Sequence, residues 1–344
     1  MEHHQEEVIH KRDLKIQKET RDTEIMRDPL AISQTFLDRL QEEDGSLREV
    51  DEMNLRTKMK YNGCNEDCRL VVWEIVAGLR KLSTNKSEWE ERQKSMQEEY
   101  ITYKDLWKNG DQSSMDKDTL DFYLKNKDII TKDVLRTDRD VAMFKDVKSE
   151  ETKILHDVIT TFCISQKVVY GQGMNDILSI LMEVTTEDYL LYYLFQFTLS
   201  LVHDIYGGNG PISTEKMKGV GVIIEVVDPE LGEFFETMRL TFEFIARWLL
   251  MLFKREFKRN LVLRLWDAFF AFPDERLFMF VAAALMVENR DNFLRAAPSF
   301  DEIYIWTINN ENKIPLDVLF SADSLLTKFK KTATEEQKAI VFVK

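Results

Sequence analysis

Apolar residues recur at helical spacing in one segment after another along this chain of 344 residues. The segment from Glu150 to Gln166 places its large apolar side chains on one side, and the segment from Ile177 to Val184 repeats the pattern. Glycine and proline, which interrupt helices and mark turns, number only 12 and 6. The sequence therefore predicts a mostly helical protein.

Charge and hydropathy argue against two classes of protein. The net charge of −14 disfavours broad nucleic-acid binding, which needs a basic face. The longest uncharged run, residues 189–202, is shorter than the roughly 18 apolar residues of a membrane span, so we expect a core helix there. The N-terminus is too charged for a signal peptide. We therefore expect no nucleic-acid partner and no direct membrane insertion.

The common motifs of self-contained enzymes are absent from the sequence. It contains no phosphate-binding loop of the NTPase type, no HExxH, no GxSxG and no GxGxxG after a strand. Cys64, Cys68 and Cys163 lack the spacing of a disulfide framework, which indicates reduced thiols and an intracellular protein. Cys64 and Cys68 could form half of a zinc site, but no second Cys/His pair stands at zinc-like spacing. We expect no metal site, no cofactor of the chain's own and no independent active site.

Breaks in the helical pattern divide the chain. The first residues mix both charges with few large apolar groups, which is typical of a disordered tail. A glycine-rich break at 207–211 is a candidate domain boundary. We expect a charged tail over 1–30, a lead-in helical segment over 31–62, helical regions over 63–205 and 206–330, and a C-terminal tail over 331–344.

A Gly-Gln-Gly triplet stands in the stretch Tyr170-Gly-Gln-Gly-Met-Asn-Asp176. The apolar pattern that follows it predicts that Gln172 lies where a loop enters a buried helix. Glycine permits close approach of another backbone, which suits a polar group presented to a partner. The alternative is an ordinary helix start with two flexible residues.

A second polar group precedes it, where Asp133 and Arg136 are three residues apart. On a helix this spacing puts both side chains on one face, and the carboxylate can hold the guanidinium in one orientation. The alternative is a surface ion pair worth under about 1 kcal/mol.

An arginine and a glutamine presented in this way suit one reaction in particular. GTP hydrolysis needs positive charge on the developing phosphoryl oxygens and an amide that orients the attacking water. Guanidinium is suited to the first task because it is planar, permanently charged and able to donate to several oxygens. A protein without a nucleotide site can supply both groups to a bound GTPase.

Four sequence blocks stand in order between Gly63 and Pro315. They are Arg69-Leu-Val-Val-Trp73 with Gly78 closing its helix, Ile130-x-x-Asp133-x-x-Arg136-Thr137, Tyr170-x-Gln172-Gly173-Met174, and Arg247-Trp248 followed by Phe253-Lys-Arg-Glu-Phe257 and Leu265-Trp266-Asp267. In type and order they resemble the TBC domain, which is found in GTPase-activating proteins for Rab GTPases. The second and third blocks match the arginine-finger and glutamine-finger motifs of that family.

The resemblance implies an all-α, two-lobed domain that binds GTP-loaded Rab. The N-terminal lobe over 63–205 would carry both fingers, and 206–330 would form the C-terminal lobe. Arg136 would neutralise transition-state charge, and Gln172 would orient the water or stabilise the phosphate. Asp133 and Tyr170 would position the fingers, Asn175 and Asp176 would fix the loop after Gln172, and Arg69, Trp73, Arg247 and Trp248 would be architectural.

The resemblance also implies the setting of the reaction. GTP and Mg²⁺ would arrive with the partner GTPase, and the protein would be a monomer that is cytoplasmic and transiently at endomembranes through Rab, where it would regulate vesicle trafficking. Two alternatives remain. A catalytically inactive Rab-binding scaffold or effector would need neither finger, and an all-α interaction module unrelated to GTPases would leave four ordered motifs to chance.

Overall fold

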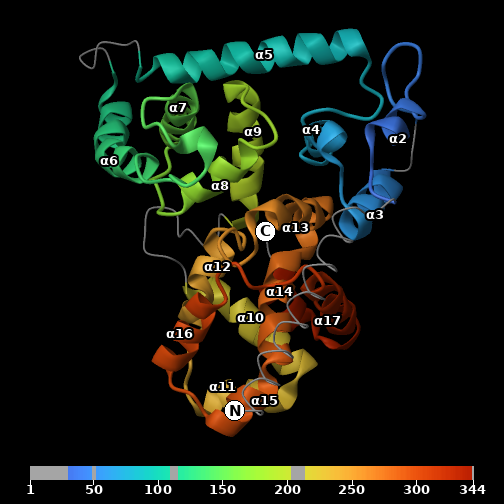
Figure 1. Cartoon of the computed structure of the whole chain (residues 1–344), viewed down its shortest axis with the longest axis vertical. Coiled ribbons are helices and arrows are strands. Elements are labelled where there is room, and N and C mark those ends of the chain that lie inside the picture. Colours follow the sequence, from blue (N-terminus) through green and yellow to red (C-terminus); the bar gives the residue numbers. More distant parts are fainter. Residues whose placement is uncertain (1–29, 49–51, 109–114, 203–213, 343–344) are drawn as a thin grey trace, which may run out of the picture.

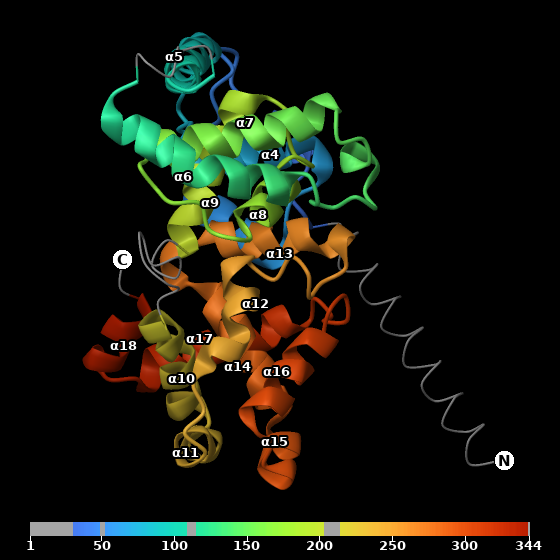
Figure 2. The ribbon, with the colours of Figure 1, turned by 90° about the vertical axis from the view of Figure 1, so that its left-hand side faces the viewer.

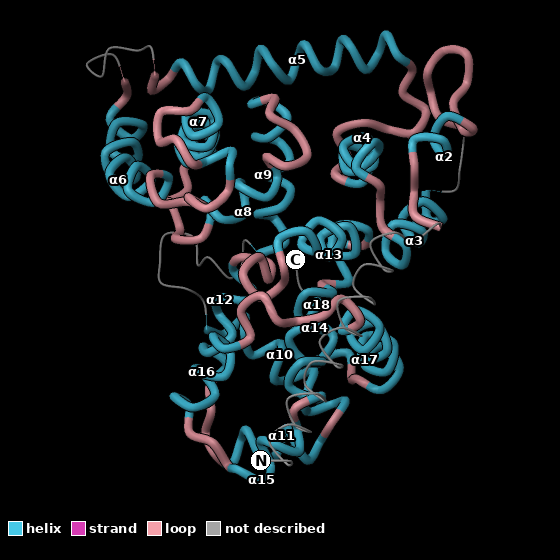
Figure 3. The backbone as a smooth tube through the Cα atoms, viewed as in Figure 1, coloured by secondary structure: helices cyan, strands magenta, loops and turns pink. Residues whose placement is uncertain are grey.

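The computed structural model of the chain describes residues 30–48, 52–108, 115–202 and 214–342. Within these ranges every regular element is a helix, apart from two isolated bridges (Figure 3). The helices form two lobes, with the N-terminal half of the chain above the C-terminal half in Figure 1. The all-α, two-lobed architecture is thus confirmed. The expected break at 207–211, and all but the last residue of the expected tail over 1–30, lie outside the described residues.

The upper lobe is built around a central buried helix, α7, which contacts α5, α6, α8 and α9. Helix α5 is long and lies across the top of the lobe (Figure 1). The elements are α2 (Gln34–Asp38), α3 (Glu52–Asn62), α4 (Glu66–Val76), α5 (Lys86–Asp105), α6 (Lys117–Val134), η2 (Ala142–Phe144), α7 (Glu150–Ser165), α8 (Met174–Leu181) and α9 (Asp188–Val202).

Side-chain caps fix where several of these helices begin. The Asn85 side chain accepts from the Glu88 amide, and Glu88 accepts in return from the Asn85 amide, which forms a capping box at the start of α5. Ser149 caps α7 in the same direction by accepting from the Thr152 amide. These caps satisfy backbone donors that have no partner inside the helix.

The lower lobe surrounds α14, in which every residue from Leu277 to Met286 is buried. The elements are α10 (Thr214–Val227), α11 (Pro229–Thr237), η3 (Phe242–Ile245), α12 (Ala246–Leu250), α13 (Arg259–Ala271), η4 (Pro273–Glu275), α14 (Leu277–Glu288), α15 (Arg290–Ala296), α16 (Phe300–Asn309), α17 (Val318–Thr332) and α18 (Glu335–Phe342). Helix α13 lies between the lobes, because it contacts α3 and α4 above and α14 below (Figure 2).

A fully buried carboxylate on α13 ties the two lobes together. Asp267 accepts from the Trp73 Nε1 at 2.8 Å, from the Cys64 backbone N–H at 2.9 Å and from the Arg69 Nε at 3.2 Å. Arg69 and Trp73, two of the residues expected to be architectural, thus meet at one acceptor from the opposite lobe. One continuous apolar core runs through both lobes around this junction.

The C-terminal end differs from the expected tail over 331–344. Helix α17 continues to Thr332, and α18 packs against α10 (Figure 2). Val341 is fully buried, and the Phe342 ring lies 5.8 Å from the Phe329 ring. The segment is too short and too charged to show a helical period, so only its packing against the core reveals it as part of the lobe.

Candidate functional site

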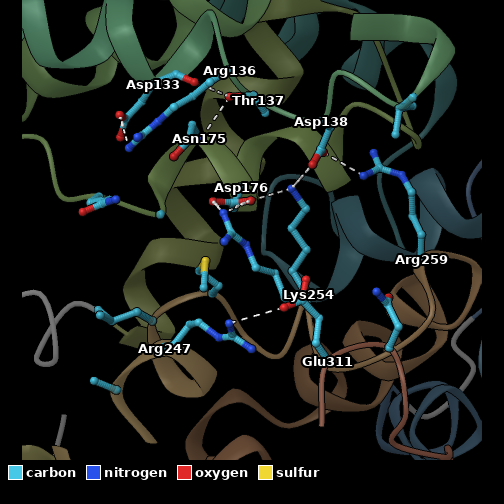
Figure 4. Close-up of a pocket in the computed structure, with 18 of the residues that line it drawn as sticks. Asp133, Arg136, Thr137, Asp138, Asn175, Asp176, Arg247, Lys254, Arg259 and Glu311 are labelled. Atoms are coloured by element: carbon cyan, nitrogen blue, oxygen red, sulfur yellow. Dashed lines mark hydrogen bonds and ion pairs between the residues drawn. The ribbon is translucent and has the colours of Figure 1, made fainter. Parts of the chain in front are cut away.

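A cleft of about 940 Å³ opens between the lobes and is lined by both predicted site residues, Arg136 and Gln172. Figure 4 shows Arg136 at this cleft. Its upper wall is the turn that follows α6, residues 135–144, here called the Arg136 turn. Beside it lies the loop that enters α8, residues 166–173, here called the Gln172 loop. The lower wall comes from α12, the segment 251–259 and the end of α16.

Arg136 is held by a buried carboxylate. Its Nη2 lies 2.7 Å from Asp133 Oδ1, and the Asp133 side chain is 7% exposed whereas the Arg136 side chain is 63% exposed. The sequence predicted both residues on one helical face, but α6 ends at Val134 and Arg136 lies beyond its C-cap. The pair forms nevertheless, and one fixed contact leaves the rest of the guanidinium open to the cleft.

Arg139 shapes the Arg136 turn. Its guanidinium donates to the backbone carbonyls of Leu135 at 2.6 Å, Val134 at 3.0 Å and Phe144. The first two are carbonyls at the end of α6, and that of Val134 also accepts from the Thr137 amide at 3.2 Å. Arg139 thus caps the helix and closes the turn at once. No sequence motif singled out Arg139. Its only signal in the sequence was a basic side chain just after a helix end.

Buried polar side chains connect the Arg136 turn to the Gln172 loop. The Tyr170 hydroxyl lies 3.0 Å from Asp133 Oδ2 and 2.9 Å from Asn175 Oδ1. Asn175 Nδ2 donates to Thr137 Oγ1 at 2.9 Å, and that hydroxyl donates to the Asp133 carbonyl at 2.7 Å. The structure therefore brings together Asp133, Tyr170 and Asn175, three of the four residues that the resemblance assigned to positioning.

Gln172 lies exposed at the tip of its loop. The following residue, Gly173, has a φ of +106° and precedes the first residue of α8, which is a backbone conformation that favours glycine. The Met174 amide donates to the Gly171 carbonyl at 3.1 Å and closes the turn. Within the described ranges no hydrogen bond restrains the Gln172 side-chain amide, so the amide is available to a partner.

Asp176, the fourth positioning residue, faces the lower lobe instead (Figure 4). It accepts from Lys254 Nζ at 2.7 Å and from Arg255 Nη2 at 3.2 Å. Lys254 Nζ also lies 2.8 Å from both carboxylate oxygens of Asp138, and Arg259 Nη1 donates to Asp138 at 2.7 Å. Burial alone would raise the pKa of Asp138, but Lys254 and Arg259 outweigh it and hold that pKa below its ordinary value.

Sequence reasoning gave no role to Asp138, Lys254 or Arg259. Two signals were present: Asp138 stands two residues after Arg136, and Lys254 belongs to the basic stretch within the fourth block. Neither signal indicates which acid meets which base, because Lys254 and Asp138 are 116 residues apart in the chain.

Arg247 and Trp248 stabilise the lower wall of the cleft through an ion pair and through ring packing. Arg247 donates from Nη2 and Nε to one oxygen of the fully buried Glu256, at 2.7 and 2.9 Å. Burial raises the pKa of Glu256, and the Arg247 charge opposes that rise. The Trp248 ring is fully buried, 5.6 Å from the Phe253 ring and 5.7 Å from the Trp306 ring.

The chain is similar to known proteins over most of its length. The sequence profile of the Rab-GTPase-TBC domain family matches residues 66–294. The chain is 28% identical over 290 residues to TBC1 domain family member 17 of Mus musculus, covering 82% of this chain and 44% of that protein. It is 22% identical over 299 residues to GTPase-activating protein GYP7 of Candida glabrata, covering 79% of this chain and 40% of that protein.

A solved structure shares the fold. The crystal structure of the Ypt/Rab-GAP domain of Gyp1p superposes with a TM-score of 0.67 at 17% identity, covering 86% of this chain and 95% of that one. The chain spans less than half the length of either sequence relative described above.

Proposed function

The chain belongs to the Rab-GTPase-TBC domain family, and from this premise we propose that it is a GTPase-activating protein for Rab-family small GTPases. It supplies Arg136 as an arginine finger and Gln172 as a glutamine finger in trans. The observation that carries the proposal is the pairing of these two residues on one wall of the cleft. Both are exposed, and a hydrogen bond from the buried Tyr170 hydroxyl to Asp133 connects the segments that carry them.

The two side chains have the properties that the reaction requires. Asp133 restricts the Arg136 guanidinium without burying it, so Arg136 can donate to phosphoryl oxygens as their charge develops. The Gln172 amide offers both a donor and an acceptor, which suits it to orient the attacking water. A pre-set geometry matters because the enzyme contribution to phosphoryl transfer is almost entirely positioning and electrostatic stabilisation.

The partner GTPase brings the nucleotide and the metal. GTP and Mg²⁺ enter the joint site on the GTP-bound Rab, and the chain acts as a monomer that completes that site. Among the described helices none is long and apolar enough to cross a membrane. The protein acts from the cytoplasm at endomembranes to which its Rab is anchored, and in this way regulates vesicle trafficking.

Single-turnover GTP hydrolysis by a panel of Rab proteins tests the proposal. We expect the wild-type protein to accelerate at least one Rab by about 10³–10⁵-fold, the range of other arginine-finger systems. Arg136→Ala and Gln172→Ala should each lose most of that acceleration while keeping a wild-type circular dichroism spectrum. Binding to a GTP-loaded Rab without acceleration would instead indicate a catalytically inactive scaffold.

A further inference from the structure

One buried lysine of the lower lobe contacts the Arg136 turn and helix α8, which directly follows the Gln172 loop. Lys254 is 7% exposed, and its Nζ touches Asp138 in the Arg136 turn, Asp176 in the first turn of α8, and Ser179 Oγ at 2.9 Å. Asp138 stands two residues after Arg136, and Asp176 stands four residues after Gln172. Figure 4 shows the side chain extending from the lower lobe to these two carboxylates.

The backbone before Lys254 is strained in a way that aims the side chain upward. Leu252 and Phe253 have φ values of +46° and +61°, in the left-handed region that residues other than glycine rarely adopt. Both are fully buried. The Phe253 amide donates to the Trp248 carbonyl at 2.8 Å, and Trp266 Nε1 donates to the Leu252 carbonyl at 2.9 Å. Packing therefore maintains a strained backbone turn, and this turn positions Lys254.

The charges show what the lysine prevents. Asp138 and Asp176 each lie within hydrogen-bond distance of the same ammonium group, so the partly buried carboxylate of Asp138 and the buried carboxylate of Asp176 are close to one another. Without a cation between them, like charges at such a separation in a poorly hydrated site would repel strongly. Arg259 and Arg255 each contact only one of the two acids among the described residues, so neither can bridge them.

We propose that Lys254 is a positioning residue for the GTPase-activating reaction, and that it sets the spacing of the Arg136 turn and the Gln172 loop from the lower lobe. The inference rests on the proposed function and deepens it. Asp133 and Tyr170 hold the two segments from within the upper lobe, whereas Lys254 holds them from the lower lobe. The lower lobe therefore takes part in activation although it carries neither finger.

The chain contains a matched control for this lysine. Lys60 is also 7% exposed and also bridges two carboxylates, with Nζ 2.8 Å from Glu275 and 2.6 Å from Asp323. It lies on α3 and does not line the cleft. Lys254→Met and Lys60→Met therefore remove the same kind of buried cation, once beneath the finger segments and once away from them.

The test is single-turnover hydrolysis with a responsive Rab, measured over a range of activator concentrations. We expect Lys254→Met to lower the maximal rate by about 10- to 100-fold, as a displacement of about 1 Å can do, with little change in the half-saturating concentration. Lys60→Met should keep the wild-type rate, and Lys254→Arg, which retains the cation, should recover most of the loss. In the Arg136→Ala/Gln172→Ala background, Lys254→Met should cause no further loss, because it acts through those two residues.

Hydrogen exchange in the absence of any GTPase gives an independent readout. Lys254→Met should increase exchange in residues 135–144 and 170–176, and Lys60→Met should not. If Lys254→Met fails to fold, the double variant Lys254→Met/Asp138→Asn, which also lacks one of the two facing carboxylates, is used in its place in both assays. Equal maximal rates and equal exchange for the Lys254 and Lys60 variants would overturn the inference and leave the proposed function standing. Failure of the wild-type protein to accelerate any Rab would overturn both.

Discussion

At the scale of single residues, the Tyr170 hydroxyl links Asp133, which holds Arg136, to Asn175 in the first turn after the Gln172 loop. Tyr170→Phe removes its hydrogen bonds to Asp133 and Asn175 while it keeps the ring. We expect a loss of about 1 kcal/mol in the free energy of unfolding, because buried acceptors lose a donor. We also expect a fall of about tenfold in the maximal rate of Rab GTP hydrolysis, because Asp133 then holds Arg136 less firmly.

Tyr103→Phe is the control for that variant. Its hydroxyl donates to Glu99 at 2.8 Å on the surface of α5, and neither residue lines the cleft. In urea unfolding and in single-turnover hydrolysis, Tyr170→Phe should show these losses and Tyr103→Phe should not. An unchanged maximal rate in Tyr170→Phe would show that the buried hydroxyl does not position Arg136.

Glu74 is the basis of a second prediction at this scale, which concerns how stability depends on pH. It is 3% exposed on α4, and burial raises its pKa from 4.5 to about 7, against an opposing contribution from Arg80. The folded state thus holds the proton more tightly than the unfolded state, so this group lowers stability as pH rises from 4.5 towards 7. Above pH 7 the accumulated loss in the free energy of unfolding is about 3 kcal/mol.

Glu74→Gln should remove that dependence, because the amide mimics the protonated acid at every pH. We expect the variant to be more stable than the wild-type protein at pH 8, and the difference to shrink towards pH 5. Urea unfolding of both proteins across this range measures it. Parallel stability curves would mean that the carboxyl titrates normally in the folded protein.

At the scale of elements, the end of α6 determines where Arg136 points. Arg139 closes the turn by donating to the carbonyls of Val134, Leu135 and Phe144. Arg139→Ala removes the hydrogen bonds of the guanidinium to these three carbonyls, and we expect it to cost about 1–2 kcal/mol of stability. Residues 135–144 should exchange amide hydrogens faster, and the maximal hydrolysis rate should fall, while α7 stays protected. Unchanged exchange in this turn would show that the backbone alone maintains it.

The elements also show what a sequence can and cannot predict. Helical period and helix-end chemistry were sufficient for the helices that bury a continuous apolar face, such as α7 and α8, and the ordered motifs located Arg136 and Gln172. The period was uninformative for α18, which is eight residues long and buried at one end. It was also silent on the turn at Leu252 and Phe253, because left-handed backbone at buried apolar residues is a result of packing and leaves no local signal.

At the scale of the whole molecule, polar side chains join the lobes at several places, among them Lys254, Asp267 and Lys60. Lys254 lies at the cleft, Asp267 accepts from Arg69, Trp73 and the Cys64 amide, and Lys60 on α3 lies between Glu275 and Asp323 of the lower lobe. The side-chain hydrogen bonds of Lys254 and Asp267 join residues 75 to 203 positions apart in the chain, so no local pattern encodes them. They add polar contacts to the apolar core that the two lobes share.

Asp267→Asn tests that view of the junction. The substitution keeps the shape of the side chain but leaves the buried Arg69 without a counter-charge, and we expect a loss of about 3–5 kcal/mol in the free energy of unfolding. Asp291→Asn is the control, because its ion pairs with Arg290 and Arg295 are on the surface and should be worth under about 1 kcal/mol. Because a single apolar core crosses the junction, far-ultraviolet circular dichroism and tryptophan fluorescence should still report one shared unfolding midpoint in the Asp267 variant, shifted to lower urea. Two separated midpoints would instead mean that Asp267, and not the shared core, makes the lobes unfold as one.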